Sequence, residues 1–127
     1  MFRIFLVEDS IPVRERVAAL LSSVQGVDTV GSAATAHDAQ SAILAVKPDA
    51  VLLDIKLAQG TGFDVLRALR TQAPQIEVYM LSNFATPAYR QMAATLGARG
   101  FFDKTTELES LRRTMAERAA QSTQSMH

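Results

Sequence analysis

Five short apolar segments alternate with five longer segments of helical period along this 127-residue chain. The longer segments repeat apolar residues every three or four positions, as Val13, Val17, Leu20 and Leu21 do, which indicates helices. This alternation predicts an α/β fold with a parallel sheet covered by helices on both faces. Right-handed crossovers leave few strand orders, and 2-1-3-4-5 is the commonest for five strands. The apolar segments are residues 3–7, 27–33, 50–53, 76–81 and 98–102.

Turn and cap residues separate the predicted elements. Ser10, Thr35, Thr86 and Thr106 each precede a helical segment, where their hydroxyls can accept hydrogen bonds from the first turn. Residues 121–127 are polar and aperiodic, so we expect a C-terminal tail that follows a single domain of residues 1–120. We expect no output domain in this chain.

Composition narrows the class of protein. Thirteen basic residues balance thirteen acidic ones, which gives no electrostatic footprint for nucleic acid or anionic membrane. The absence of cysteine excludes a disulfide framework and a thiolate metal site. No apolar stretch is long enough to span a bilayer, and residues 1–7 lack the features of a signal peptide. We therefore expect a cytoplasmic protein that binds neither membrane nor nucleic acid directly.

Polar side chains follow four of the five predicted strands. Glu8 and Asp9 follow the first strand and Asp54 the third, while Ser82 and Lys104 follow the fourth and fifth. The carboxyl ends of neighbouring parallel strands form one crevice, where open α/β sheets bind ligands. Each residue alone is more simply explained as a turn or solvated residue. Together they predict one site, because all of these strand ends carry a suitable group.

The predicted crevice holds the groups that phosphoryl transfer requires. Three carboxylates would repel one another without metal, and oxygen ligands of this kind suit Mg²⁺. Asp54 could attack phosphorus and form an acyl phosphate. The Lys104 ammonium and the Ser82 hydroxyl could then contact phosphoryl oxygens. If Ser82 moves to reach the phosphoryl group, the loop behind it moves too, which is the behaviour of a switch.

These motifs resemble the receiver domain of bacterial two-component response regulators, the family that includes the chemotaxis protein CheY. The resemblance covers about residues 2–118 and implies the flavodoxin-like fold of CheY-like receivers, with strand order 2-1-3-4-5. The motifs that carry it are Phe5–Asp9, Val51–Asp54, Met80–Ser82, Gly97-Ala98 and Phe101–Lys104.

The resemblance implies a phosphoacceptor and a metal site. Asp54 matches the phosphoacceptor, and Glu8 and Asp9 match the acidic pair that binds Mg²⁺ with it. Lys56 falls where the family supplies a backbone carbonyl to the metal. A histidine kinase or a phosphotransfer protein would donate the phosphoryl group. The only catalysis expected is the domain's own phosphorylation and slow autodephosphorylation, so we expect a signalling switch rather than an enzyme.

The resemblance also implies a switch mechanism and an output face. Ser82 and Phe101 match the switch positions, and Lys104 matches the family lysine. Residues 86–118 would contact an unidentified downstream protein or a second copy in a homodimer. The candidate exposed charges of that face are Arg90, Arg112, Arg113 and Glu117, although each is more simply explained as solvated.

Four positions depart from the family pattern without removing a chemical group: Ala58, Thr61, Asn83 and Thr105. Thr105 stands where the family usually has a proline after a cis bond. Phe84 is bulky and could shield an acyl phosphate from water.

Three other functions remain as alternatives. A pseudo-receiver would bind proteins independently of phosphorylation, although all the required groups are present. An aspartate-nucleophile phosphatase needs an acid two positions beyond the nucleophile, where this chain has Lys56. A flavin carrier needs a hydroxyl- and glycine-rich loop after the first strand, where this chain has Glu8-Asp9-Ser10-Ile11-Pro12.

Overall fold

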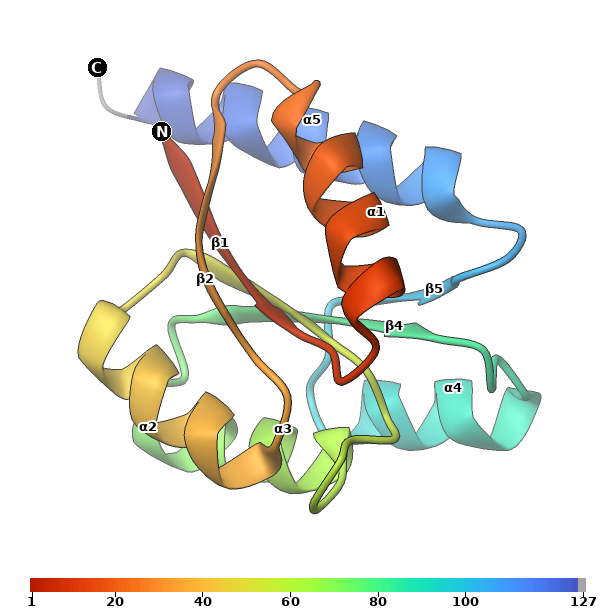
Figure 1. The fold of residues 1–127 in the computed structure, drawn as a ribbon. Helices are drawn as coiled ribbons and strands as arrows, with labels where there is room; N and C mark the ends of the chain where they lie inside the picture. The colour runs from red at the N-terminus through yellow and green to blue at the C-terminus, as the bar shows by residue number, and fades with distance from the viewer. Residues whose placement is uncertain (126–127) are drawn as a thin grey trace.

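All five strands of the computed structural model lie parallel in one sheet, in the order β2-β1-β3-β4-β5, which confirms the predicted topology (Figure 1). The structure describes residues 1–125. The strands are β1 (Phe2–Val7), β2 (Val27–Ala33), β3 (Ala50–Leu53), β4 (Glu77–Ser82) and β5 (Gly100–Asp103). The helices are α1 (Ile11–Ser22), α2 (Ala36–Val46), α3 (Gly62–Gln72), α4 (Pro87–Thr95) and α5 (Leu108–Ser125).

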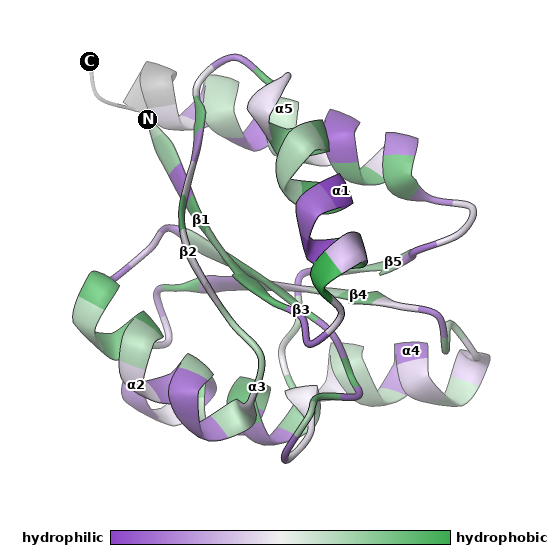
Figure 2. Cartoon of the chain, in the orientation of Figure 1, coloured by the Kyte–Doolittle hydropathy of each residue, from purple (hydrophilic) through white to green (hydrophobic). Residues whose placement is uncertain are grey.

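The sheet separates two apolar cores (Figures 1 and 2). Successive strand residues point to opposite faces, so Phe5 and Val7 pack with α2, α3 and α4, whereas Ile4 and Leu6 pack with α1 and α5. All four residues of β3 are buried, as expected of a central strand covered on both faces. Polar residues are therefore found only beyond the ends of β3, and the carboxyl ends of the strands carry the predicted site.

The caps predicted at Ser10, Thr35 and Thr86 are present, whereas α5 begins at Leu108, beyond the cap predicted at Thr106, whose N donates to Asp103 Oδ1 at 3.2 Å instead. Ser10 Oγ accepts a hydrogen bond from Val13 N at 3.4 Å, which caps α1. Thr35 and Thr86 cap α2 and α4 in the same way. Thr61, which was not predicted as a cap, forms a capping box with Asp64 at the start of α3. The described helices include none that is long and apolar enough to cross a membrane.

The segment predicted as a polar tail from residue 121 is helical as far as the structure describes it. Helix α5 continues to Ser125, and Met126 and His127 lie outside the described residues. Leu111, Met115 and Ala119 bury one stripe of α5 against the sheet. Because the packed turns already nucleate the helix, each further turn gains backbone hydrogen bonds even where its side chains are polar.

Candidate functional site

Backbone hydrogen bonds beyond the strand ends bring the polar residues to one edge of the sheet. Glu8 N donates to Ala33 O at 2.9 Å, and Asp54 N donates to Val7 O at 3.0 Å. Beyond the ends of β4 and β5, Lys104 N donates to Ser82 O at 3.0 Å. The parallel register therefore aligns residues that lie far apart in the sequence, as the sequence analysis expected.

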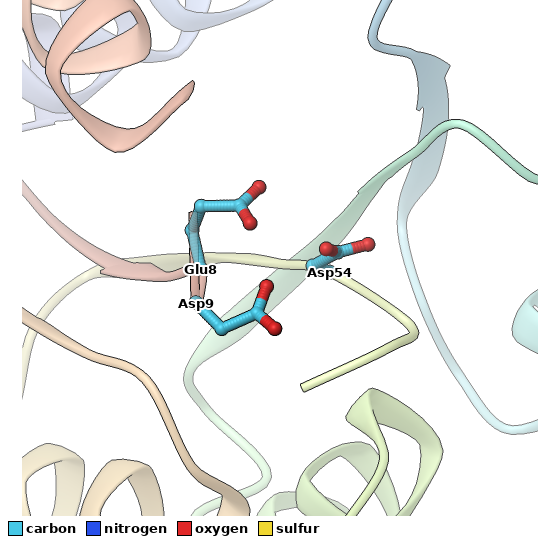
Figure 3. A group of neighbouring side chains, drawn as sticks. All are labelled: Glu8, Asp9 and Asp54. Atoms are coloured by element: carbon cyan, nitrogen blue, oxygen red, sulfur yellow. The ribbon is translucent and has the colours of Figure 1, made fainter. Parts of the chain in front are cut away.

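Three carboxylates lie close together at this edge (Figure 3). Glu8, Asp9 and Asp54 each offer one oxygen, and these oxygens lie within 4.8 Å of one another. Glu8 and Asp54 are buried, whereas Asp9 is exposed and leaves the cluster open to solvent. A donor set made only of carboxylate oxygens, with room for water on one side, fits a hard dication such as Mg²⁺. The cluster could bind a metal in the way expected of receiver domains.

Lys104 is the cation that pairs with this cluster in the structure. Its Nζ lies 2.8 Å from Asp54 Oδ2 and also forms an ion pair with Glu8 Oε1. Its side chain is only 6% exposed, and a charge buried to that degree requires a partner. Burial opposes the charged form of the ammonium, but the hydrogen bonds to Asp54 and Glu8 outweigh it and raise the pKa of Lys104.

Glu8 experiences opposing effects. Burial raises the pKa of Glu8, and the nearby charge of Asp54 raises it further. Hydrogen bonds from Lys104 and from Ser10 N, the latter at 3.0 Å, oppose this rise without cancelling it. Glu8 therefore takes up a proton more readily than an ordinary glutamate, and a bound dication would favour the charged form again.

The remaining predicted residues lie around the cluster. Ser82 is fully buried, and its hydroxyl accepts a hydrogen bond from Phe84 N at 3.0 Å. Lys56 is exposed, and its ammonium lies 4.4 Å from the centroid of the Phe84 ring. Phe101 is partly buried against the core on the α4 side of the sheet. These positions fit the roles implied by the family, but the roles themselves stay predictions.

Gly62 has a role at this site that was not predicted from the sequence. A Cβ atom at this position would lie 2.0 Å from the carbonyl oxygen of Asp54, so the loop can close only over a glycine. Gly62 N also donates to Ile55 O at 2.7 Å, and Ile55 N donates to Asp54 Oδ1 at 2.8 Å. Gly62 thus fixes the backbone that orients the Asp54 carboxylate. The glycine in the sequence was compatible with an ordinary turn, because the close approach involves two ends of a folded loop.

Thr105, which replaces the family proline, follows a trans peptide bond, because every peptide bond in the described part of the chain is trans. Asp103 Oδ1 accepts hydrogen bonds from Thr105 N at 2.7 Å and from Thr106 N at 3.2 Å. The turn after Lys104 is therefore closed by a side-chain carboxylate, and Lys104 still reaches Asp54.

This chain is similar to known proteins in sequence and in fold. The response regulator receiver domain family matches residues 4–116. The chain is 30% identical over 104 residues to the DNA-binding transcriptional activator DevR/DosR of Mycobacterium tuberculosis, a match covering 82% of this chain and 48% of that protein. The chain spans about half the length, or less, of the curated relatives that it matches.

Two solved structures illustrate the likeness of fold. The signal receiver domain of the putative response regulator NarL from Mycobacterium tuberculosis superposes with a TM-score of 0.85 at 28% identity, over 94% of this chain and 96% of that one. The chemotaxis protein CheY4 of Vibrio cholerae superposes with a TM-score of 0.81 at 26% identity, over 92% and 98% of the two chains.

Proposed function

The chain belongs to the family of response regulator receiver domains, and we propose that it accepts a phosphoryl group on Asp54 from a histidine kinase or a phosphotransfer protein. The observation that carries this proposal is the convergence of three carboxylates and one buried lysine at the carboxyl edge of the sheet. Such a group is poorly suited to structural stability alone, because buried charges are costly to desolvate.

Glu8, Asp9 and Asp54 would hold Mg²⁺, with the Lys56 carbonyl as a further ligand. The ion, when bound, would neutralise negative charge on the phosphoryl oxygens. Asp9 is the exposed member of the cluster and would leave its side of the site open to the incoming donor. Glu8 would be held in place by its hydrogen bond from Ser10 N.

In the proposed transfer, a carboxylate oxygen of Asp54 forms a bond to phosphorus while the phosphorus–nitrogen bond of a phosphohistidine breaks. The imidazole leaves with the electron pair of that bond and takes a proton from solvent. The Ile55 N–H keeps Asp54 Oδ1 oriented, and Lys104 moves its contact from the carboxylates to a phosphoryl oxygen. Ser82 gives up its hydrogen bond from Phe84 N and donates to another phosphoryl oxygen.

Loss of the bond between Ser82 and Phe84 would shift the β4–α4 loop and, through Phe101, the surface formed by residues 86–118. This shift would change the affinity of that surface for a downstream protein or a second copy of the chain. The curated relatives include a DNA-binding activator and a protein-glutamate methylesterase, so relatives do not agree on one output. The balanced charge of this chain favours a protein as its direct target.

Intact mass after incubation with acetyl phosphate and Mg²⁺ tests the proposal. The wild type should gain one phosphoryl group, and Asp54→Asn should gain none. Asp28→Asn is a matched control, because Asp28 is an exposed aspartate near the opposite end of the sheet, and it should behave as the wild type. A wild type that gains nothing would contradict the proposal and favour a pseudo-receiver that binds proteins independently of phosphorylation.

A further inference from the structure

One arginine outside the acidic cluster connects the segments that are proposed to move. Arg90, on α4, donates from Nη1 to Phe101 O at 3.2 Å and from Nε to Ala85 O at 3.3 Å. Its Nη2 forms an ion pair with Glu107 Oε1 at 2.6 Å. Its guanidinium also lies 5.1 Å from the centroid of the Phe101 ring, within cation–π range. The expectation that Arg90 is simply a solvated charge was therefore wrong.

Glu107 extends these contacts to the turn that carries Lys104. Its Oε1 also accepts a hydrogen bond from Asp103 N at 2.9 Å, and Glu107 N donates to Asp103 O at 2.9 Å. The hydrogen bonds from Arg90 and Asp103 N lower the pKa of Glu107, so its carboxylate is charged at neutral pH. Arg90 and Glu107 together thus link the β4–α4 loop, β5 and the turn before α5.

The movement proposed for Ser82 is incompatible with keeping all of these contacts. The Ser82 hydroxyl is engaged by Phe84 N, and the next residue, Ala85, is held by Arg90. If the loop shifts so that Ser82 can reach a phosphoryl group on Asp54, the bond from Arg90 to Ala85 must lengthen or break. The other contacts of Arg90 with β5 and Glu107 resist that shift.

We propose that Arg90 and Glu107 form a latch that stabilises the unphosphorylated arrangement of the β4–α4 loop and β5. The latch is the ion pair between the two residues together with the Arg90 hydrogen bonds to Ala85 and Phe101. Arg90 is a positioning residue in this scheme, which rests on the proposed phosphorylation of Asp54. Because contacts made only in one arrangement lower the population of the other, breaking the latch should speed phosphorylation.

The experiment uses intact mass over time to measure the rate at which acetyl phosphate with Mg²⁺ phosphorylates the protein. We expect Arg90→Ala and Glu107→Gln to react about two- to fivefold faster than the wild type, the effect that a half-exposed ion pair supports. Gln at position 107 keeps an acceptor for Asp103 N and removes only the charge. The double variant should be no faster than the faster single variant, because the two residues act as one unit.

A second ion pair provides the matched control. Arg112 and Glu109 pair on the surface of α5 at 2.5 Å, with side chains 39% and 65% exposed. Arg112→Ala and Glu109→Gln should react at the wild-type rate. The urea midpoint of each variant reports any purely structural role.

The possible results distinguish a failure of the latch from a failure of the proposed function. A lower midpoint with an unchanged or slower reaction in both latch variants would overturn the latch. Equal acceleration in the control variants would also overturn it. A wild type that is not phosphorylated would overturn the proposed function and the latch with it. If the wild type is phosphorylated and all variants react at the wild-type rate, the latch alone is overturned.

Discussion

Replacing Lys104 by methionine should destabilise the protein strongly unless a dication is present. Methionine keeps most of the length of the side chain and removes its charge. Glu8 and Asp54 would then remain buried beside each other without the ammonium that now contacts both. One substitution thus removes the cationic partner of both carboxylates.

The expected magnitude follows from the geometry. The Nζ–Oδ2 separation to Asp54 is 2.8 Å, and unit charges so close attract by about 6 kcal/mol at an effective dielectric constant of about 20. The desolvation of both groups offsets part of this attraction, and removal of one partner from a buried pair costs about 3–5 kcal/mol. Since Glu8 can relieve the repulsion by binding a proton, we expect a loss near the lower limit, about 3 kcal/mol.

Urea unfolding at neutral pH with a chelator measures this loss. With a slope of about 2 kcal/mol per molar urea, the midpoint should fall by about 1.5 M. Saturating Mg²⁺ should then raise the midpoint of Lys104→Met by more than that of the wild type, because the ion replaces the missing positive charge. Lys47→Met is the control, since Lys47 is exposed near the opposite end of the sheet, and it should match the wild type. Equal midpoints for Lys104→Met and wild type without metal would refute the reasoning, as would an equal gain from Mg²⁺.

Two further predictions concern other parts of the molecule. Burial raises the pKa of Glu77, but hydrogen bonds, first of all from Arg118, outweigh burial and hold the pKa below 4.5. The charged Glu77 side chain therefore contributes to the free energy of unfolding above that pH, and this contribution is lost as the pH falls through the lowered pKa. Glu77→Gln should therefore lower the free energy of unfolding by about 1–2 kcal/mol at neutral pH, with the difference from wild type shrinking in urea titrations as the pH falls through the lowered pKa of Glu77. Phe84→Ala should shorten the lifetime of the phosphorylated protein by about two- to fivefold, the equivalent of a contact worth about 0.5–1 kcal/mol, because Phe84 and the Lys56 ammonium over its ring would shield the acyl phosphate from water. An unchanged decay, followed by intact mass after acetyl phosphate is removed, would show that Phe84 is no shield.

The sequence predicted the sheet and the acidic cluster because both depend on local patterns combined with a general rule. Runs such as Ala50–Leu53 identify strands, and the rule that ligands bind at the carboxyl ends of parallel strands places Glu8, Asp9 and Asp54 together. The helix caps at Ser10 and Thr35 depend on side chains only a few residues apart, so they too could be predicted.

The contacts that escaped prediction join residues from different elements at particular distances. The need for glycine at position 62 arises only when the loop closes on the Asp54 carbonyl. Arg90 contacts Phe101 and Glu107 only because the folded chain places α4 beside β5 and the turn that follows it. Nothing in the local sequence distinguishes these residues from an ordinary turn glycine and a surface arginine.

The two ends of the described chain lie at the same side of the molecule, away from the carboxyl ends of the central strands (Figure 1). Phe2 begins the first strand there. The guanidinium of Arg118, near the end of the last helix, lies 5.7 Å from the centroid of the Phe2 ring. A fluorophore, an affinity tag or a surface tether attached at either end would therefore leave Asp54, the proposed phosphoacceptor, accessible. By the same geometry, a module fused there would respond to the proposed phosphorylation of Asp54 only through a displacement transmitted along the sheet or through the helices that cover it.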